Sequence, residues 1–102
     1  MSNLVFFLPS GLTKFGNGDG DRPEWLFDEA PDFHGSWRRV LFSLCEEYVA
    51  PLLPEGYELF EMQTAHNPCR VKYHGEYDDD PTFEPFTVVV PHDAVMEAVR
   101  HE

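Results

Sequence analysis

The sequence predicts one α+β domain in the order β-α-β-β-β-α, with a four-stranded, mostly antiparallel sheet and one long and one short helix on one face. Three observations support this prediction. The 102 residues fit a single domain, and 42% of them are hydrophobic, which suffices for one packed core. One stretch has the apolar spacing of a helix. Segments typical of strands lie on both sides of it.

The N-terminal third predicts a strand, a loop and a short helix. Leu4–Leu8 is an unbroken apolar run, which is typical of a strand in the middle of a sheet. Residues from about 11 to 22 are rich in Gly and Asp, so we expect a mobile surface loop there. Asp21 then suits the N-cap of a short helix, with Pro23 and Glu24 in its first turn.

The long helix is the clearest element of the sequence. Its apolar residues recur at intervals of three and four positions and form one stripe. They are Trp37, Val40, Leu41, Leu44, Cys45, Tyr48, Val49 and Leu52. Ser36 is positioned to cap the first turn, and Pro51 ends the helix at or soon after Ala50.

The C-terminal half predicts a hairpin, a further strand and a closing helix. Segments 57–65 and 69–77 are rich in β-formers, and the turn sequence 66–68 separates them, so they predict an antiparallel hairpin. Segment 83–90 is expected to extend the same sheet. Residues 91–100 place Val and Met side chains on one helical face and predict the short closing helix.

Charge is the strongest functional signal in the composition. The chain has 19 Asp and Glu against 7 Lys and Arg, a formal net charge of −12. Such a surface repels nucleic acid and anionic membranes, and it attracts basic partners by steering that weakens as salt rises. We therefore expect a basic protein partner, no direct nucleic-acid or membrane binding, and a chain that is a monomer or a weak dimer.

The two cysteines, Cys45 and Cys69, indicate the compartment. The chain begins without the basic region of a secretory signal, and no apolar run approaches the roughly 20 residues that cross a bilayer. These features predict a cytoplasmic protein with both thiols reduced. If the gene belongs to a phage, which the charge pattern discussed below suggests, the compartment is the cytoplasm of the host. Each Cys is expected to act as a small buried hydrophobe.

Acidic residues concentrate in two segments, 17–36 and 76–84, which together supply ten of the twelve net negative charges. The second segment includes a predicted acidic loop over about 76–82. Glu55, Glu58 and Glu61 would join these segments in one acidic face if the strand from Tyr57 lies near either of them. The predicted partner-binding residues are Asp19, Asp21, Glu24, Asp28, Asp32, Glu76, Tyr77, Asp78, Asp79, Asp80 and Glu84.

Aromatic side chains stand among these acids, a mixture that protein interfaces favour. Trp25, Phe27 and Phe83 are expected to be mainly core residues, because a core this small needs them. Tyr77 and Phe33 are the better candidates for the surface.

Carboxylates two positions apart in extended chain stand roughly 6.6 Å from each other, comparable with successive phosphates of a nucleic-acid strand. The leading hypothesis is therefore a nucleic-acid mimic that inhibits a nucleic-acid-handling complex, such as the anti-CRISPR or anti-restriction proteins of phages and mobile elements. One alternative is an immunity protein that neutralises a toxin such as a nuclease. Others are a non-catalytic adaptor subunit, and acidity that serves solubility alone.

Catalysis and cofactor binding have little support in the sequence. It contains no G-x-S-x-G, P-loop, H-E-x-x-H or dinucleotide motif, so we expect no enzyme and no cofactor. His66, Cys69 and His74 have a spacing that suits zinc, but a structural zinc site needs four ligands. We therefore interpret them as ordinary hairpin residues and expect no metal.

Overall fold

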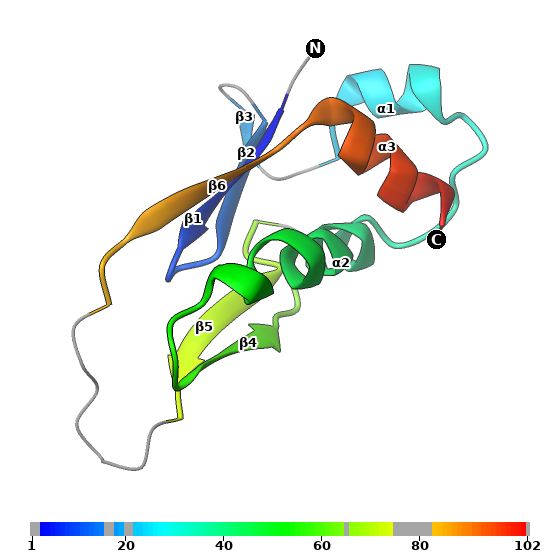
Figure 1. Ribbon diagram of the computed structural model, residues 1–102. Coiled ribbons are helices and arrows are strands. Elements are labelled where there is room, and N and C mark those ends of the chain that lie inside the picture. Colours follow the sequence, from blue (N-terminus) through cyan, green and yellow to red (C-terminus); the bar gives the residue numbers. More distant parts are fainter. Residues whose placement is uncertain (1–2, 16–17, 20–21, 65, 75–82, 102) are drawn as a thin grey trace.

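The computed structural model describes residues 3–15, 18–19, 22–64, 66–74 and 83–101 (Figure 1). Its strands are β1 (Leu4–Leu8), β2 (Leu12–Phe15), β3 (Gly18–Asp19), β4 (Tyr57–Glu61), β5 (Cys69–Tyr73) and β6 (Phe86–Val90). Its helices are α1 (Glu24–Glu29), α2 (Trp37–Tyr48) and α3 (His92–Arg100), with a 3₁₀ turn, η1, over Ala50–Leu52. The α+β class is confirmed. The predicted acidic loop over about 76–82 lies outside the described residues.

The strands form two antiparallel sheets, which corrects the predicted single sheet. One sheet has the order β3-β2-β1-β6, and β4 pairs with β5 in the other. The predicted antiparallel hairpin is confirmed for β4 and β5, which pair Tyr57 with Tyr73 and Glu61 with Cys69. Residues 65 and 75–77 of the predicted hairpin lie outside the described residues. The last strand does not extend that hairpin, because β6 pairs with β1 along its whole length, from Leu4 opposite Val90 to Leu8 opposite Phe86.

The predicted mobile loop over about 11–22 is also wrong in part, since it contains β2 and β3. Leu12–Phe15 alternates between exposed and buried positions, with Thr13 and Phe15 on the buried face. This two-residue period is the pattern of a half-buried strand. Gly11 makes the preceding turn possible, because its φ of +79° is a conformation that other residues rarely adopt. The predicted element order is therefore incomplete.

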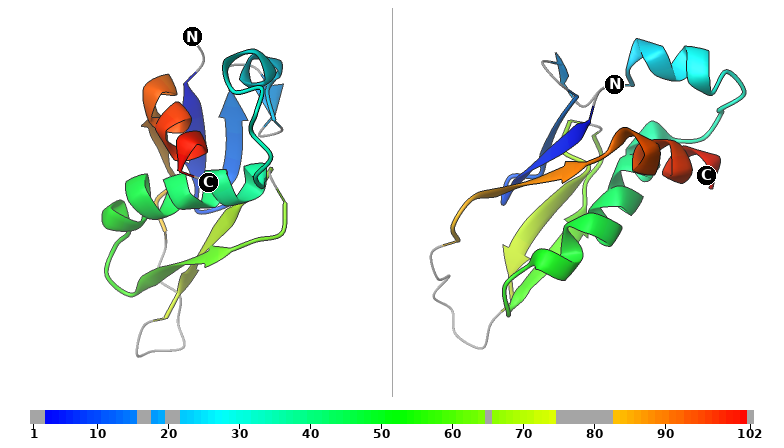
Figure 2. Two further views of the ribbon diagram at one scale, coloured as in Figure 1. Left: turned by 90° about the vertical axis from the view of Figure 1, so that its right-hand side faces the viewer. Right: turned by 45° about the horizontal axis from the view of Figure 1, so that its top comes forward.

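The helices lie on one face of the four-stranded sheet (Figure 1 and Figure 2). The long helix is confirmed: the Arg39 amide donates a hydrogen bond to Ser36 Oγ at its N-terminus. The chain then continues into η1, where Leu52 is 58% exposed and so does not belong to the helical stripe. The N-cap of α1 is Pro23, not Asp21, and it makes no side-chain capping bond.

The core forms where α2 and α3 meet the inner faces of both sheets. Its fully buried side chains include Leu4 and Phe6 of β1, Val40 and Leu44 of α2, and Val95 of α3. Backbone hydrogen bonds also tie the two sheets together, since the Thr13 amide donates to the His66 carbonyl. No helix in the described part of the chain is long and apolar enough to cross a membrane.

Candidate partner-binding site

Among the described residues, the acidic side chains predicted to bind a partner divide between two ends of the molecule. Glu24 and Asp28 are exposed on α1, and Asp32 is exposed in the turn that follows. Glu84 is exposed just before β6, and segment 83–85 lies at the end remote from α1 (Figure 1). Asp19 belongs to β3, and the other predicted residues lie outside the described part of the chain: Asp21, Glu76, Tyr77, Asp78, Asp79 and Asp80.

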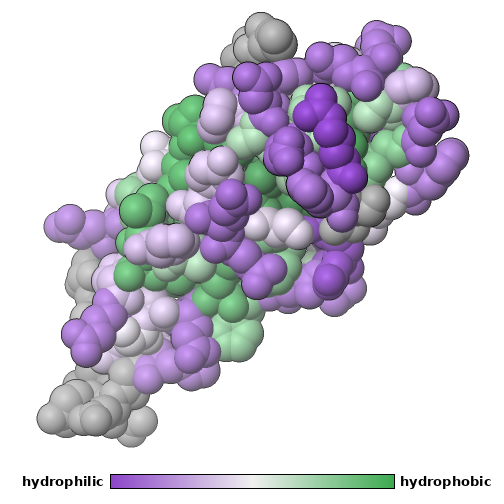
Figure 3. Space-filling model, turned by 45° about the vertical axis from the view of Figure 1, so that its right-hand side comes forward, coloured by the Kyte–Doolittle hydropathy of each residue, from purple (hydrophilic) through white to green (hydrophobic). Residues whose placement is uncertain are grey.

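At the α1 end, Arg22 lies over two aromatic side chains, the exposed Phe27 and the half-buried Phe33. The Arg22 guanidinium lies 4.1 Å from the ring centroid of Phe27 and 5.1 Å from that of Phe33. Phe27 is 55% exposed, contrary to its predicted place in the core, whereas Phe33 is half-buried against the core. Figure 3 shows hydrophilic residues gathered over this end of the molecule. The end is therefore strongly polar, and its basic residue is already engaged with Phe27 and Phe33.

A buried histidine joins α1 to α3. His92 Nε2 lies 3.0 Å from a carboxylate oxygen of Glu29, and the His92 ring centroid is 4.4 Å from that of Trp25. Trp25 also makes an edge contact with Phe15 of β2, at 5.8 Å between ring centroids. These contacts hold Glu29 against the protein, so its carboxylate is less available to a partner than those of Glu24 and Asp28.

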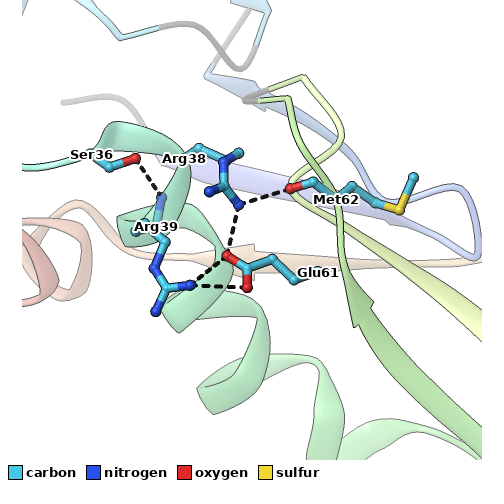
Figure 4. Close-up of polar contacts among 5 residues, drawn as sticks. All are labelled: Ser36, Arg38, Arg39, Glu61 and Met62. Atoms are coloured by element: carbon cyan, nitrogen blue, oxygen red, sulfur yellow. Dashed lines mark hydrogen bonds and ion pairs between the residues drawn. The ribbon is translucent and has the colours of Figure 1, made fainter.

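Glu61, which could have joined an acidic face, is instead bound by two arginines of α2 (Figure 4). Its carboxylate lies 2.7 Å from Arg38 Nη1 and 2.8 Å from Arg39 Nη1. Arg38 Nη1 also donates to the carbonyl oxygen of Met62 at 2.9 Å. The hydrogen bond from Arg38 is the main cause that lowers the pKa of Glu61. The three charges anchor α2 to β4, and Glu61 offers little net charge to a partner.

The opposite end of the molecule carries a groove of about 500 Å³ with an aromatic floor. The groove is lined by Leu52, Pro54, Glu55, Tyr57, Phe83, Glu84, Pro85 and Phe86. Phe83 connects its aromatic residues, because its ring packs edge-on against Tyr57 at 5.0 Å and stacks with Phe86 at 5.6 Å between centroids. This groove, between η1, β4 and the segment before β6, is called the acidic–aromatic groove below.

Charge at the acidic–aromatic groove is unbalanced. Glu55 and Glu84 are both exposed, and neither forms an ion pair within the described residues. Segment 75–82, which precedes Phe83 in the sequence and lies outside the described residues, contains four more carboxylates. Arginine and lysine combine an apolar stem with a cationic head, which fits an aromatic floor beside carboxylates. The groove therefore suits a cationic side chain of a partner.

Two residues that line this groove differ from their predicted places. The sequence predicts Leu52 in the helical stripe and Phe83 in the core, but Leu52 is exposed and Phe83 is only half-buried. A signal existed in the sequence, since the proline at position 51 ends the helix before the stripe reaches Leu52. Glu55 lines the same groove as Glu84, the described carboxylate of the second acidic segment.

The described residues hold no group of three His, Cys, Asp or Glu side chains arranged to bind a metal ion. His66 and His74 are exposed, whereas Cys69 is buried against Cys45, so the zinc-like spacing does not bring its members together. Comparisons with protein-family models, with curated proteins and with solved structures gave no match.

Proposed function

We propose that the protein is a non-catalytic inhibitor that docks its acidic–aromatic groove and the adjoining acidic segment on the basic surface of a nucleic-acid-handling protein. The observation that supports this most is the pairing of an aromatic floor with two exposed carboxylates, Glu55 and Glu84. The partner surface would ordinarily hold nucleic acid. The inhibitor occupies it with carboxylates in place of phosphates.

The whole-chain charge supports the same function. The formal charge of −12 steers a small protein toward a cationic groove over distances set by the Debye length, about 8 Å at physiological salt. Two of the seven basic residues, Arg38 and Arg39, are bound to Glu61, so this cluster has a net charge of only +1 and offsets a single exposed carboxylate. Anti-CRISPR and anti-restriction inhibitors encoded by phages and other mobile elements are the functional class that fits this chemistry.

The test is affinity capture from cells that carry nucleic-acid-handling complexes, with elution by a salt gradient and separately by duplex DNA. The expected result is one nucleic-acid-binding complex that DNA displaces and that binds less tightly as salt rises. A partner that resists DNA and moderate salt would overturn the mimic proposal and favour an immunity protein instead.

Variants at the groove separate charge from apolar anchoring. Glu55→Gln combined with Glu84→Gln should weaken partner binding about tenfold and flatten its salt dependence. Glu46→Gln with Glu47→Gln, which removes the same charge from the exposed face of α2, is the matched control and should change affinity little. Asp78, Asp79 and Asp80 converted together to Asn test the adjoining segment. Unchanged affinity in both groove and segment variants would refute the electrostatic account.

A second candidate function, an adaptor subunit, has support from the outer face of the four-stranded sheet. Phe7 lies opposite Leu12, and Val5 lies opposite Val89, so these apolar side chains share one face. Leu12 is 43% and Val89 56% exposed. An exposed apolar sheet face with a free edge strand is a common docking surface. Val89→Lys should abolish binding if the protein is an adaptor and leave the inhibitor's affinity unchanged.

A further inference from the structure

The two cysteines of the chain meet inside the fold. Cys45 lies on α2 and Cys69 begins β5, and their Sγ atoms are 2.8 Å apart. Both side chains are fully buried. The sequence places them 24 positions apart, so only the packing of the hairpin against α2 brings them together. The sequence predicts two reduced, buried thiols and gives no sign that they touch; the structure holds both as free cysteines in contact with each other.

The two cysteines are packed between α2, β5 and the turn that connects β1 to β2. Cys45 points into the core from the apolar stripe of α2, next to the fully buried Leu44 and Val49. The carbonyl of Cys69 lies so close to Gly11 that a Cβ atom there would collide with it. A disulfide requires the sulfur atoms at about 2.05 Å, so the bond closes a gap of about 0.8 Å.

We propose that Cys45 and Cys69 are the site of an intramolecular disulfide that joins α2 to β5. The oxidant is a low-molecular-weight disulfide such as oxidised glutathione. One cysteine thiolate attacks it, forms a mixed disulfide and releases one small thiol. The second cysteine then attacks the protein sulfur of that mixed disulfide and releases the other small thiol. The protein loses two protons and two electrons, and the small disulfide is reduced to two thiols.

Burial determines when this exchange takes place. Desolvation, with a smaller contribution from the hydrogen bond to Cys69, raises the pKa of the Cys45 thiol far above its usual range. In the folded protein Cys45 therefore stays protonated, and neither sulfur atom is accessible to the oxidant. Exchange proceeds while the hairpin is away from α2, during folding. Once formed, the bond is shielded from reductants by the same packing.

The bond closes a loop that contains the end of α2, the η1 turn and β4. Loops of this length lower the entropy of the unfolded chain enough to raise the Tm of a small domain by about 10 °C or more. The loop also carries Tyr57, which lines the acidic–aromatic groove. Disulfide formation does not depend on which partner that groove binds.

The experiment refolds the denatured, reduced full-length chain in a mixture of reduced and oxidised glutathione. Remaining thiols are then alkylated, and the intact mass is measured. The expected product has lost two hydrogen atoms, about 2 Da, and carries neither alkyl groups nor glutathione. The already folded, reduced protein in the same mixture should react far more slowly. A refolded chain with two alkylated thiols, or with bound glutathione, would overturn the proposal.

Thermal unfolding provides the second readout. The oxidised wild-type protein should unfold at a higher temperature than the reduced protein, whereas Cys45→Ala should unfold at the same temperature with and without glutathione. If Cys45→Ala does not fold, the intact mass of the wild-type protein decides the question alone. Equal unfolding temperatures for oxidised and reduced wild-type protein would contradict a link between α2 and β5.

Discussion

At the scale of single residues, the carboxylates of the protein have two different roles. Those paired with arginine hold elements together, and exposed, unpaired ones leave their negative charge available to a partner. Glu61 illustrates the first case, because Arg38 and Arg39 convert an acidic strand residue into an anchor for α2. Glu84 illustrates the second, since its exposed carboxylate has no ion-pair partner among the described residues. The sequence contains both as ordinary glutamates, and only the tertiary fold distinguishes them.

Gly11 is the residue at which a methyl group should be most damaging. Its φ of +79° strains any other residue, and a Cβ atom would collide with the Cys69 carbonyl oxygen. Gly11→Ala should lower the free energy of unfolding by at least about 2 kcal/mol, measured by urea denaturation. The control is Gly35→Ala, at an exposed position without positive φ. Equal effects of the two changes would contradict the tight contact with Cys69.

Glu61 should also give the stability of the protein a specific pH dependence. Hydrogen bonds from Arg38, and then from Arg39, lower its pKa in the folded state. A lowered pKa means that the stabilisation is complete above the ordinary glutamate pKa and is lost as the pH falls through the folded value. Glu61→Gln should therefore reduce stability at neutral pH and flatten its decline in acid, measured by urea denaturation across pH.

The matched control for this pH effect is Glu47→Gln on the exposed face of α2, where no ion pair is formed within the described residues. It should leave the acid decline as in the wild-type protein. A wild-type decline in the Glu61→Gln variant would show that other carboxylates control acid stability.

At the scale of elements, local patterns predict the three α-helices and the β4–β5 hairpin, but not how the remaining strands pair. The stripe from Trp37 and the cap at Ser36 specify α2 without help from the rest of the chain. The pairing of β6 with β1 depends on contacts between the two ends of the sequence, which no local period records. β2 was overlooked because the glycines after Phe15 obscured its short alternation. The acidic–aromatic groove could not be predicted from the sequence for a related reason. Its lining forms only when Phe83 contacts Tyr57 and Phe86, which come from other parts of the chain or another element.

The N-terminus of α2 provides a test at this scale. Ser36→Ala removes the oxygen that accepts a hydrogen bond from the Arg39 amide and should destabilise the protein by about 1 kcal/mol, measured by urea denaturation. Ser43→Ala, at an exposed position inside the same helix, should be neutral or slightly stabilising. The assignment of Ser36 as the cap fails if Ser43→Ala is as destabilising as Ser36→Ala.

At the scale of the whole molecule, the net charge of −12 opposes compaction, because like charges repel across a small body. Raising the ionic strength from about 0.01 M to about 0.15 M shortens the Debye length from about 30 Å to about 8 Å. The Tm should rise by about 4 °C or more as this repulsion is screened, measured by calorimetry. Sucrose at matched osmolality serves as the control. A Tm that falls with salt would mean that ion pairs such as those of Glu61 outweigh the repulsion.

The pairing of β1 with β6 has a consequence during synthesis of the chain on the ribosome. Ribosomes add about 5 to 20 residues per second, so roughly 4 to 16 s separate the synthesis of Leu8 from that of its neighbour Phe86. During that interval the edge of β1 that later pairs with β6 has no strand beside it. An unpaired strand edge is a template for pairing with another chain, so β1 is most open to such contact before β6 is made.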